Sequence, residues 1–339
     1  LKKLFAKHNL DKPNLKFKTE SADISDLINQ MSDDGLVVDH IDTSGDIIRV
    51  PVKASLDTRP DKLGQGEKSG WYFFHQTDNH WISVYGNWRT NQQWKFYSNT
   101  IRELNPTERA ELNRKVEENL ERAKEERRNK NNEVAIDCLK RLKNSKNVTE
   151  HEYLTEKGLK NNYGLTEING SLICPVYSTR NTNKELRSLQ YITTKNKRFV
   201  SASEVKSGIY TVGLGWDDWS NIKTIAVTEG LATALSVYES TGLPTICVFS
   251  ANFGLSALEN IRKFCDAEFL ICFDHDKNGV GQARAKEICA SLGKCLIRIP
   301  SKVGDYNDLF QEEGSNAVKN EILSEGYKFS QYSIKNFVG

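Results

Sequence analysis

Cysteine pairs, long apolar runs and a strong charge of either sign are all missing from this sequence. Its 339 residues include 7 cysteines, none spaced as Cys-x-x-Cys, which argues against a structural zinc site and indicates a reducing, cytoplasmic compartment. No stretch approaches the roughly 18 apolar residues of a membrane-spanning helix, and no secretory signal is visible, so we expect no membrane partner. The net charge is only +2, so any surface that attracts a polyanion must be local.

Short apolar runs alternate with amphipathic segments between residues 222 and 310. The runs are rich in β-branched and aromatic residues, which is typical of buried strands in a parallel sheet. Their alternation predicts right-handed βαβ units and an α/β fold with a doubly wound parallel sheet. We expect strands at 225–228, 245–249, 269–273 and 295–299, and helices at 231–240, 255–264 and 281–292.

Acidic residues stand where two of these strands end. Glu229 follows the first strand, and Asp274 and Asp276 follow the third. Ligands of such sheets gather beyond the carboxyl ends of the strands, and residues two apart in an extended segment project the same way. Three crowded carboxylates repel one another, and a hard divalent cation relieves that repulsion. The sequence therefore predicts a site for Mg²⁺ or Mn²⁺ with these three acids as ligands and as the catalytic residues.

Two other interpretations compete with this site. The pattern from Asp274 to Gly279 also opens like an EF-hand calcium loop, but Ala285 stands at the twelfth position, where that loop needs a glutamate. Alternatively, acids at strand ends cap the helices that follow. Capping would account for one of the three acids more readily than for all of them.

The order of these motifs resembles the Toprim fold. That fold is shared by bacterial and phage primases, type IA and type II topoisomerases and certain nucleases, and its motifs are a Glu-Gly after the first strand and an Asp-x-Asp after a later one. They stand here as Glu229-Gly230 and Asp274-His275-Asp276, and the resemblance covers about residues 220–317.

A third motif resembles an Asp-x-Asn-Asp element near the end of the Toprim domain in phage and plasmid primases. It reads Asp305-Tyr306-Asn307-Asp308. The resemblance implies that Asp305 and Asp308 support a second metal ion or orient the first ligands. A simple turn is the alternative.

A basic region precedes the predicted Toprim domain. Strands are expected at 171–177, 188–193 and 208–212, and the segments Leu189-Gln190-Tyr191-Ile192 and Lys195-Asn196-Lys197-Arg198-Phe199 resemble the subdomain that precedes Toprim in primases. Cations facing a metal–carboxylate cluster would bind nucleotide phosphates. The candidate phosphate-binding residues are Arg187, Lys195, Lys197, Arg198 and Gly230, with solvated loops as the alternative.

The N-terminal part carries an aromatic block from 70 to 89 that predicts a β-hairpin. It is similar to a module found ahead of Toprim domains in plasmid and phage primases. These aromatic residues form either the core of a small β unit or a surface on which nucleic-acid bases stack, with Trp88 and Arg89 the candidates for nucleic-acid binding. Residues 106–146 are rich in charge and predict a long solvated helix, either a connector or an arm that contacts a nucleic-acid backbone.

These observations divide the chain into five parts. They are a β-rich N-terminal module (1–104), a charged helical connector (105–148), a basic α+β subdomain (149–218), the Toprim catalytic domain (219–317) and a C-terminal tail (318–339).

The resemblance implies a Toprim-type DNA primase of the phage and plasmid, or bacterial, family. Its activity is the metal-dependent, template-directed synthesis of short RNA primers on single-stranded DNA from NTPs, in the cytoplasm of a bacterial or phage-infected cell. A replicative helicase is a candidate partner. The alternatives are a Toprim nuclease and a non-catalytic, replication-associated module that binds nucleic acid.

Overall fold

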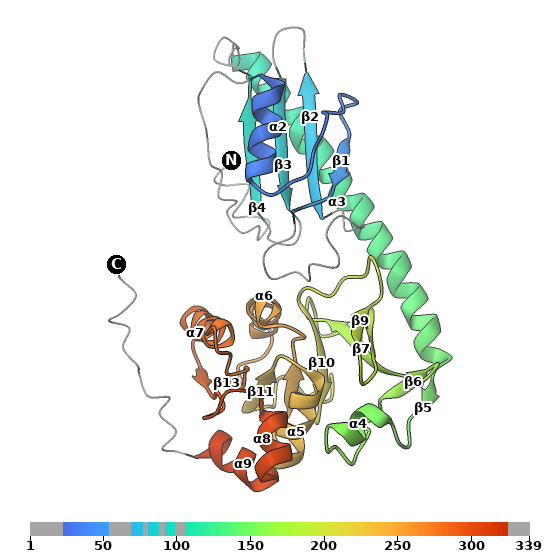
Figure 1. Ribbon diagram of the computed structural model, residues 1–339, viewed down its shortest axis with the longest axis vertical. Helices are drawn as coiled ribbons and strands as arrows, with labels where there is room; N and C mark the ends of the chain where they lie inside the picture. The colour runs from blue at the N-terminus through green and yellow to red at the C-terminus, as the bar shows by residue number, and fades with distance from the viewer. Residues whose placement is uncertain (1–22, 54–68, 77–80, 88–91, 99–105, 325–339) are drawn as a thin grey trace. The chain divides into compact units, whose positions relative to one another are not determined.

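The computed structural model describes two compact units, residues 1–128 and 129–339. The described residues are 23–53, 69–76, 81–87, 92–98 and 106–324 (Figure 1). Helix α3 (Pro106–Lys143) confirms the predicted long helix and begins in the first unit and ends in the second. Among these residues, no helix is both long enough and apolar enough to cross a membrane.

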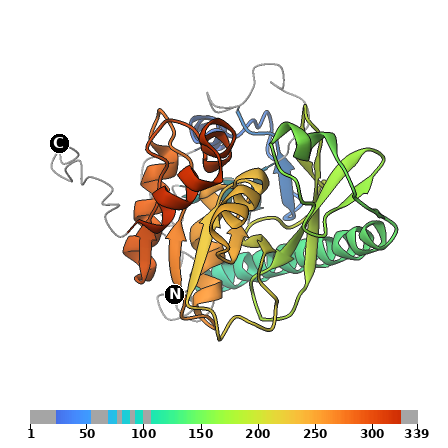
Figure 2. The same ribbon diagram turned by 90° about the horizontal axis from the view of Figure 1, so that it is seen from below.

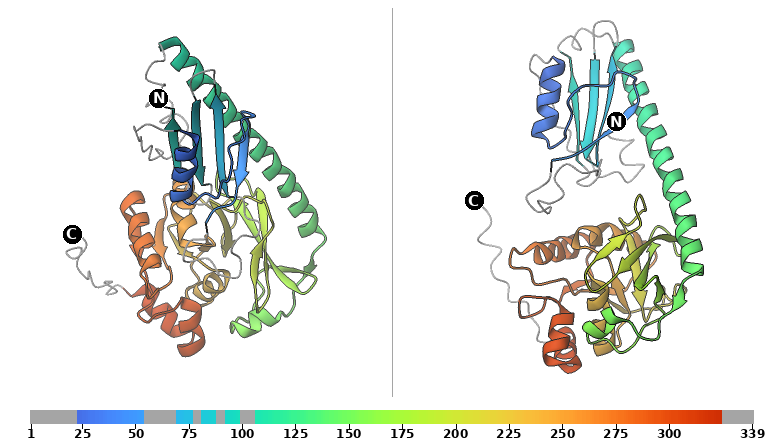
Figure 3. Two further views of the ribbon diagram at one scale, coloured as in Figure 1. Left: turned by 45° about the horizontal axis from the view of Figure 1, so that its top comes forward. Right: turned by 45° about the vertical axis from the view of Figure 1, so that its right-hand side comes forward.

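The first unit is built on an antiparallel sheet with strand order β1-β2-β3-β4. The strands are β1 (Ile47–Val50), β2 (Gly70–Gln76), β3 (Trp81–Asn87) and β4 (Gln92–Tyr97). Helix α2 (Ile24–Asp33) begins at Asp23, whose side chain accepts the N–H of Asp26 at 2.8 Å. Helix α2 covers one face of the sheet, and the first part of α3 lies along the other (Figure 3).

The aromatic block forms the core of this unit. Along β2, Tyr72 and Phe74 pack in the cluster that contains Leu27 of α2, whereas Trp71 and Phe73 pack on the opposite face. Successive residues of a strand point to opposite faces, and both faces of β2 are covered, so every aromatic residue of the run is buried. The described aromatic residues of the block are therefore core residues of this sheet. Trp88 and Arg89, the candidates for base stacking, lie outside the described residues.

The second unit contains one large mixed sheet with the order β14-β13-β11-β12-β10-β7-β6-β5; β8 pairs with β7, and β9 pairs with β8. Strands β11, β12, β13 and β14 run parallel. The strands of this unit are β5 (Lys146–Asn147), β6 (Thr166–Ile168), β7 (Ser171–Ser178), β8 (Leu186–Ile192), β9 (Lys197–Phe199), β10 (Gly208–Val212), β11 (Thr224–Thr228), β12 (Thr245–Cys247), β13 (Glu268–Ile271) and β14 (Cys295–Ile297).

Helices cover both faces of the parallel part, as predicted for a doubly wound sheet. Ile225 and Val227 of β11 pack with α6 (Ala251–Arg262) and α7 (Val280–Leu292), and Ala226 between them packs on the other side. That other side is covered by α5 (Leu231–Thr241), α8 (Tyr306–Glu313) and α9 (Ser315–Leu323), which lie side by side (Figure 2). A strand buried on both faces must be apolar throughout, which explains the continuous run.

The part before the parallel strands is a small α+β layer joined to the same sheet. Strand β10 pairs antiparallel with β12 on one side and with β7 on the other. One face of β7 and β8 packs on α5, and Ile173 and Leu189 on the other face pack against Cys138 of α3. Helix α4 (Glu152–Glu156) begins at His151, whose ring Nδ1 accepts the N–H of Tyr153. The five domain boundaries stay predictions.

Gly213 supports a packing test of this architecture. It follows β10 with φ +67°, and a Cβ there would overlap the ring of Tyr238 on α5. Gly213→Ala should lower the free energy of unfolding by roughly 2 kcal/mol or more, through backbone strain and overpacking together. Gly242→Ala is the matched control because its φ is +71° and no atom lies within 4 Å of its Cβ position. Urea unfolding should show the smaller loss for the control, and equal losses would contradict the close packing of α5 on β10.

Candidate active site

The ends of two neighbouring strands bring Glu229 and Asp274 together. Strands β11 and β13 pair in parallel, so both deliver their following residues to the same edge of the sheet. The backbone N–H of Asp274 donates to Glu229 Oε1 at 3.3 Å, and the N–H of Ala251, the first residue of α6, donates to Glu229 Oε2 at 3.0 Å. Burial raises the pKa of Glu229, the two N–H donors act against that rise, and the charges of Asp276 and Asp305 add to it.

Asp276 is held by the start of α7. Its Oδ2 accepts the N–H of Gly281 at 2.9 Å. A Cβ on Gly281 would lie 2.5 Å from the Asp274 carbonyl oxygen, 3.1 Å from Glu229 Oε1 and 3.3 Å from Asp276 Oδ2. The carboxylates of Glu229 and Asp276 and the backbone of Asp274 therefore surround one backbone position, and a side chain there would displace them.

Asp305 and Asp308 lie beside this cluster at the start of α8. A backbone bridge joins His275 to Gly304, with the His275 N–H donating to the Gly304 carbonyl at 2.9 Å. Asp305 Oδ1 accepts the N–H of Asp308 at 3.0 Å, and Asp308 Oδ2 accepts that of Asp305 at 3.0 Å, which forms a capping box. This motif therefore forms the N-cap and first turn of α8, and it places two further carboxylates near Asp274.

Asp274 differs from the other acids. Its Oδ1 is buried and has no hydrogen-bond partner among the described residues. Burial, followed by the charges of Glu229, Asp305, Asp276 and Asp308, raises the pKa of Asp274 to about 8. A buried carboxyl group surrounded by like charges and lacking a cationic partner is a feature of functional sites.

The acids fit a hard divalent cation in donor chemistry. Carboxylate oxygens are the ligands that Mg²⁺ and Mn²⁺ prefer, and the unpartnered Asp274 oxygen offers a lone pair. Within the described part of the chain, no group of three acidic, histidine or cysteine side chains is already arranged around a single ion position. Glu229 and Asp276 instead direct carboxylate oxygens to backbone N–H groups, which fixes their places in the cluster.

Capping of helix starts accounts for more of these acids than the single one expected from the sequence. Glu229, Asp276 and Asp305 each accept an N–H from the first turn of a helix, so only Asp274 lacks this explanation. The EF-hand interpretation is wrong, because strand β13 precedes Asp274 and Ala285 is buried within α7.

The basic residues divide between two faces of β9. Lys197 Nζ lies 5.3 Å from the ring centroid of Tyr153, and Phe199 packs edge-on against Phe249, which lies two residues before Ala251. The pKa of the Cys247 thiol is raised by burial and lowered by the charge of Lys197. The charges of Glu229 and Asp274 act on the same thiol, so Lys197 lies in the same region of the sheet as these acids.

Arg198 and Arg187 lie elsewhere. The Arg198 guanidinium lies 5.1 Å from the ring centroid of Tyr191, on the α3 side of β9. The Arg187 side chain is only 5% exposed and pairs with Glu204 at 2.8 Å and Glu185 at 2.7 Å. We therefore assign Arg187 a structural role and do not retain it as a phosphate ligand.

The remaining candidates are Lys195 and Gly230. Lys195 is exposed in the turn between β8 and β9. Gly230 is the N-cap of α5 and has a φ of −109°, which other residues also adopt.

Asn307 is a positioning residue that the sequence alone does not reveal. It is 1% exposed, and its amide donates to the Lys157 carbonyl at 2.8 Å and to Ser236 Oγ at 2.9 Å. These contacts fix the start of α8, and with it Asp305, against α5 and the end of α4. An asparagine within a turn motif gives no sign of partners so distant in sequence.

Comparison with known proteins agrees with this geometry. Residues 224–316, from β11 into α9, match the Toprim domain family. The chain contains a Toprim domain. DNA primase TraC of Escherichia coli is 29% identical over 252 residues, which are 71% of this chain and 23% of TraC. The chain bearing this Toprim domain therefore spans about a quarter of the length of that relative.

Solved structures similar to the chain include two primases. The primase fragment of the bacteriophage T7 primase-helicase protein aligns with 50% of this chain and 70% of its own, at 17% identity and a TM-score of 0.38. The Aquifex aeolicus primase, comprising zinc-binding and RNA polymerase domains, aligns with 76% of this chain and 79% of its own, at 12% identity and a TM-score of 0.42.

Asp274→Asn tests the electrostatics of the Toprim site. The folded pKa of about 8 lies above the ordinary value of 3.8, so the folded protein binds this proton more tightly and loses stability as pH rises between those values. In EDTA at pH 8 the variant should be more stable than the wild type by on the order of 1 kcal/mol or more, and the difference should shrink toward pH 4. Thermal unfolding across this pH range measures it.

Asp266→Asn is the control of opposite sign. A hydrogen bond from Lys294 lowers the pKa of this exposed carboxylate, so its removal should slightly reduce stability above pH 4. An Asp274→Asn variant that is no more stable than the wild type at pH 8 would contradict the assigned environment.

Proposed function

We propose that this chain is the catalytic core of a DNA primase. It would join NTPs into short RNA primers on a single-stranded DNA template in a metal-dependent reaction. The Toprim match and the identity to a DNA primase over 71% of the chain support this proposal. A replicative helicase is the further partner we propose, and the cytoplasm of a bacterial or phage-infected cell the location.

The observation that carries the proposal is the environment of Asp274. Its buried oxygen, which has no partner among the described residues, lies among four other carboxylates, and the charge of Lys197 acts on the same Cys247 thiol as the charges of Glu229 and Asp274. A site with both a cation-binding edge and a basic strand suits a triphosphate substrate, whose negative charge needs both.

Each residue has a distinct part in the proposed reaction. Asp274 and Asp276 would hold the divalent cation with Glu229, and Asp305 and Asp308 would support a second. When bound, such a cation lowers the pKa of a hydroxyl nucleophile and stabilises the departing pyrophosphate. Lys195 and Lys197 would bind the triphosphate, and the N–H groups at the start of α5, next to Gly230, would face its oxygens. Glu229, whose two oxygens accept backbone N–H groups, would complete this set of cation ligands from a fixed position.

Primer synthesis is the direct test. The wild type, single-stranded DNA, labelled NTPs and Mg²⁺ or Mn²⁺ should yield short labelled oligomers that gel electrophoresis resolves by length. Asp274→Asn and Asp276→Asn should reduce the rate by about a hundredfold or more, because each removes charge stabilisation specific to the transition state. Asp266→Asn, an equal change on the exposed surface of the same domain, should retain the wild-type rate.

The same assay separates synthesis from hydrolysis. A Toprim nuclease would use the same carboxylates to cut DNA but has no need of a basic strand that binds an incoming nucleotide. Metal-dependent cutting of the template without incorporation of NTPs would replace the primase proposal with the nuclease. Neither reaction, in a folded protein supplied with metal, would favour a non-catalytic module.

Salt dependence tests the basic strand. Replacing Lys195 and Lys197 together with Ala should weaken binding of single-stranded DNA and reduce the slope of log K against log salt by up to about 1.4, since each phosphate contact contributes about 0.7. The matched control replaces Lys263 and Lys294 with Ala. These lysines follow the C-terminal ends of α6 and α7, away from the carboxylates, and their replacement changes the net charge equally. Equal slopes for the two double variants would place the DNA away from β9.

A further inference from the structure

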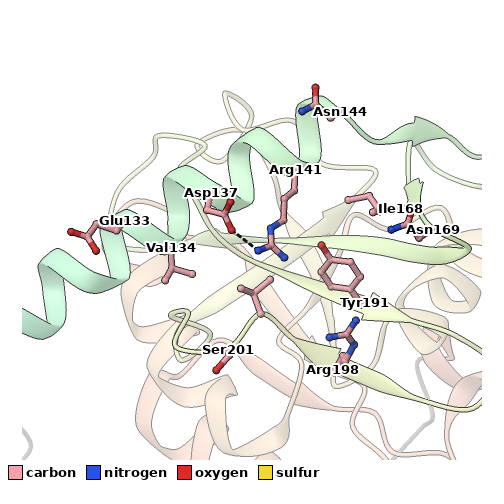
Figure 4. Close-up of a pocket in the computed structure, with 11 residues that line it drawn as sticks. Glu133, Val134, Asp137, Arg141, Asn144, Ile168, Asn169, Tyr191, Arg198 and Ser201 are labelled. Carbon is pink, nitrogen blue, oxygen red and sulfur yellow. Dashed lines mark ion pairs between the residues drawn. The ribbon is translucent and has the colours of Figure 1, made fainter.

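A cavity of about 840 Å³ lies on the face of β9 that carries Arg198, opposite to the face that carries Lys197. It is formed by the last turns of α3, the strands β8 and β9 and the turn after β6 (Figure 4). The residues that line it are Glu133, Val134, Asp137, Arg141, Asn144, Ile168, Asn169, Tyr191, Arg198, Val200 and Ser201. A cavity of this size accommodates a ligand the size of a nucleotide.

Two guanidinium groups enter this cavity from opposite walls. Arg141 comes from α3, and Arg198 comes from β9 and lies over the ring of Tyr191 at 5.1 Å from its centroid (Figure 4). The Tyr191 hydroxyl also raises the pKa of Arg141, so both arginines interact with one aromatic side chain. Paired guanidinium groups of fixed orientation favour bidentate binding of phosphate oxygens.

The existing partner of Arg141 does not block such a ligand. Its ion pair with Asp137, at 2.6 Å, joins side chains that are 47% and 51% exposed and four residues apart on one helix. Pairs of this kind contribute little to stability, so the guanidinium can turn to a phosphate at small cost.

The rest of the lining favours a nucleotide over a simple anion. Val134, Ile168 and Val200 provide an apolar wall, and the exposed face of the Arg198 guanidinium is a plane on which a base can stack. Asp137 and Glu133 balance the two arginines in charge, which weakens the attraction for inorganic phosphate. Their oxygens can accept hydrogen bonds from ribose hydroxyls or amino groups of a base.

We infer that this cavity, which we call the α3–β9 pocket, is a second nucleotide-binding site, separate from the carboxylate cluster. The two sites are separate because successive residues of a strand point to opposite faces. Lys197 and Arg198 are adjacent in sequence but lie on opposite faces of β9. The ligand is either a free nucleotide or a nucleotide within single-stranded nucleic acid, since both present the same phosphate, sugar and base. The inference does not depend on the reaction proposed for the carboxylates.

Binding in EDTA tests this site without metal at the carboxylates. The probes are a fluorescent N-methylanthraniloyl derivative of ATP and a fluorescein-labelled oligothymidylate, each titrated with the full chain. Arg141→Ala and Arg198→Ala should weaken binding of at least one probe by about tenfold, the loss expected for one stacking or charge-assisted contact. Arg114→Ala is the matched control, because Arg114 forms the same kind of exposed pair, with Glu118 four residues on, in the first part of α3.

The pattern of losses identifies the source of the nucleotide. Weaker binding of the ATP probe alone assigns a free nucleotide, and weaker binding of the oligonucleotide, alone or with the ATP probe, assigns single-stranded nucleic acid. Ser201→Asp adds a carboxylate at an exposed lining position and should weaken the same probe, which covers the case of an arginine variant that folds poorly. The inference is overturned if the wild type binds neither probe in EDTA, or if Ser201→Asp and the folded arginine variants bind both as tightly as Arg114→Ala.

Discussion

Backbone N–H groups at the starts of three helices hold like charges together at one edge of the sheet. Glu229 accepts from Ala251 of α6, Asp276 from Gly281 of α7, and Asp305 from the first turn of α8. Each helix also directs the positive end of its dipole toward the carboxylate that it holds. These interactions offset a mutual repulsion that would otherwise drive the acids apart. The βαβ order is what makes this possible, because every parallel strand ends where the next helix begins.

Among the described residues, none gives the Asp274 Oδ1 atom a comparable hydrogen bond. The neighbouring acids are stabilised because they accept N–H groups at helix starts. A buried carboxyl group with an unpartnered oxygen instead destabilises the folded state, and no contact among the described residues offsets that cost. A cluster in which four acids accept backbone N–H groups and one keeps an unpartnered oxygen is more specific evidence of a site than acids counted along a sequence. The buried Asn307 amide joins α8 to α5 and so fixes the start of α8, where Asp305 lies.

The parallel sheet and its acids could be predicted from the sequence because the information is local. Each strand is a continuous apolar run, and each acid follows directly. The roles of the basic residues could not, because they depend on distant partners. Arg187 is buried by an ion pair with Glu204, 17 residues further on. Strand β9 has three residues, too few to show a period, and only its pairing with β8 separates Lys197 from Arg198.

Strand β10 has a mechanical consequence. It hydrogen-bonds to β12 of the Toprim domain and to β7 of the preceding layer, so the sheet continues without a break between them. A hinge at this junction would have to break backbone hydrogen bonds in a sheet covered on both faces, and each broken pair would leave buried donors and acceptors unsatisfied. We therefore expect β9 and the carboxylate edge to behave as a stiff frame with a set spacing. A ligand of this edge would meet a site of fixed geometry, and selection among ligands would rest on fit rather than on closure of one part of the sheet onto another.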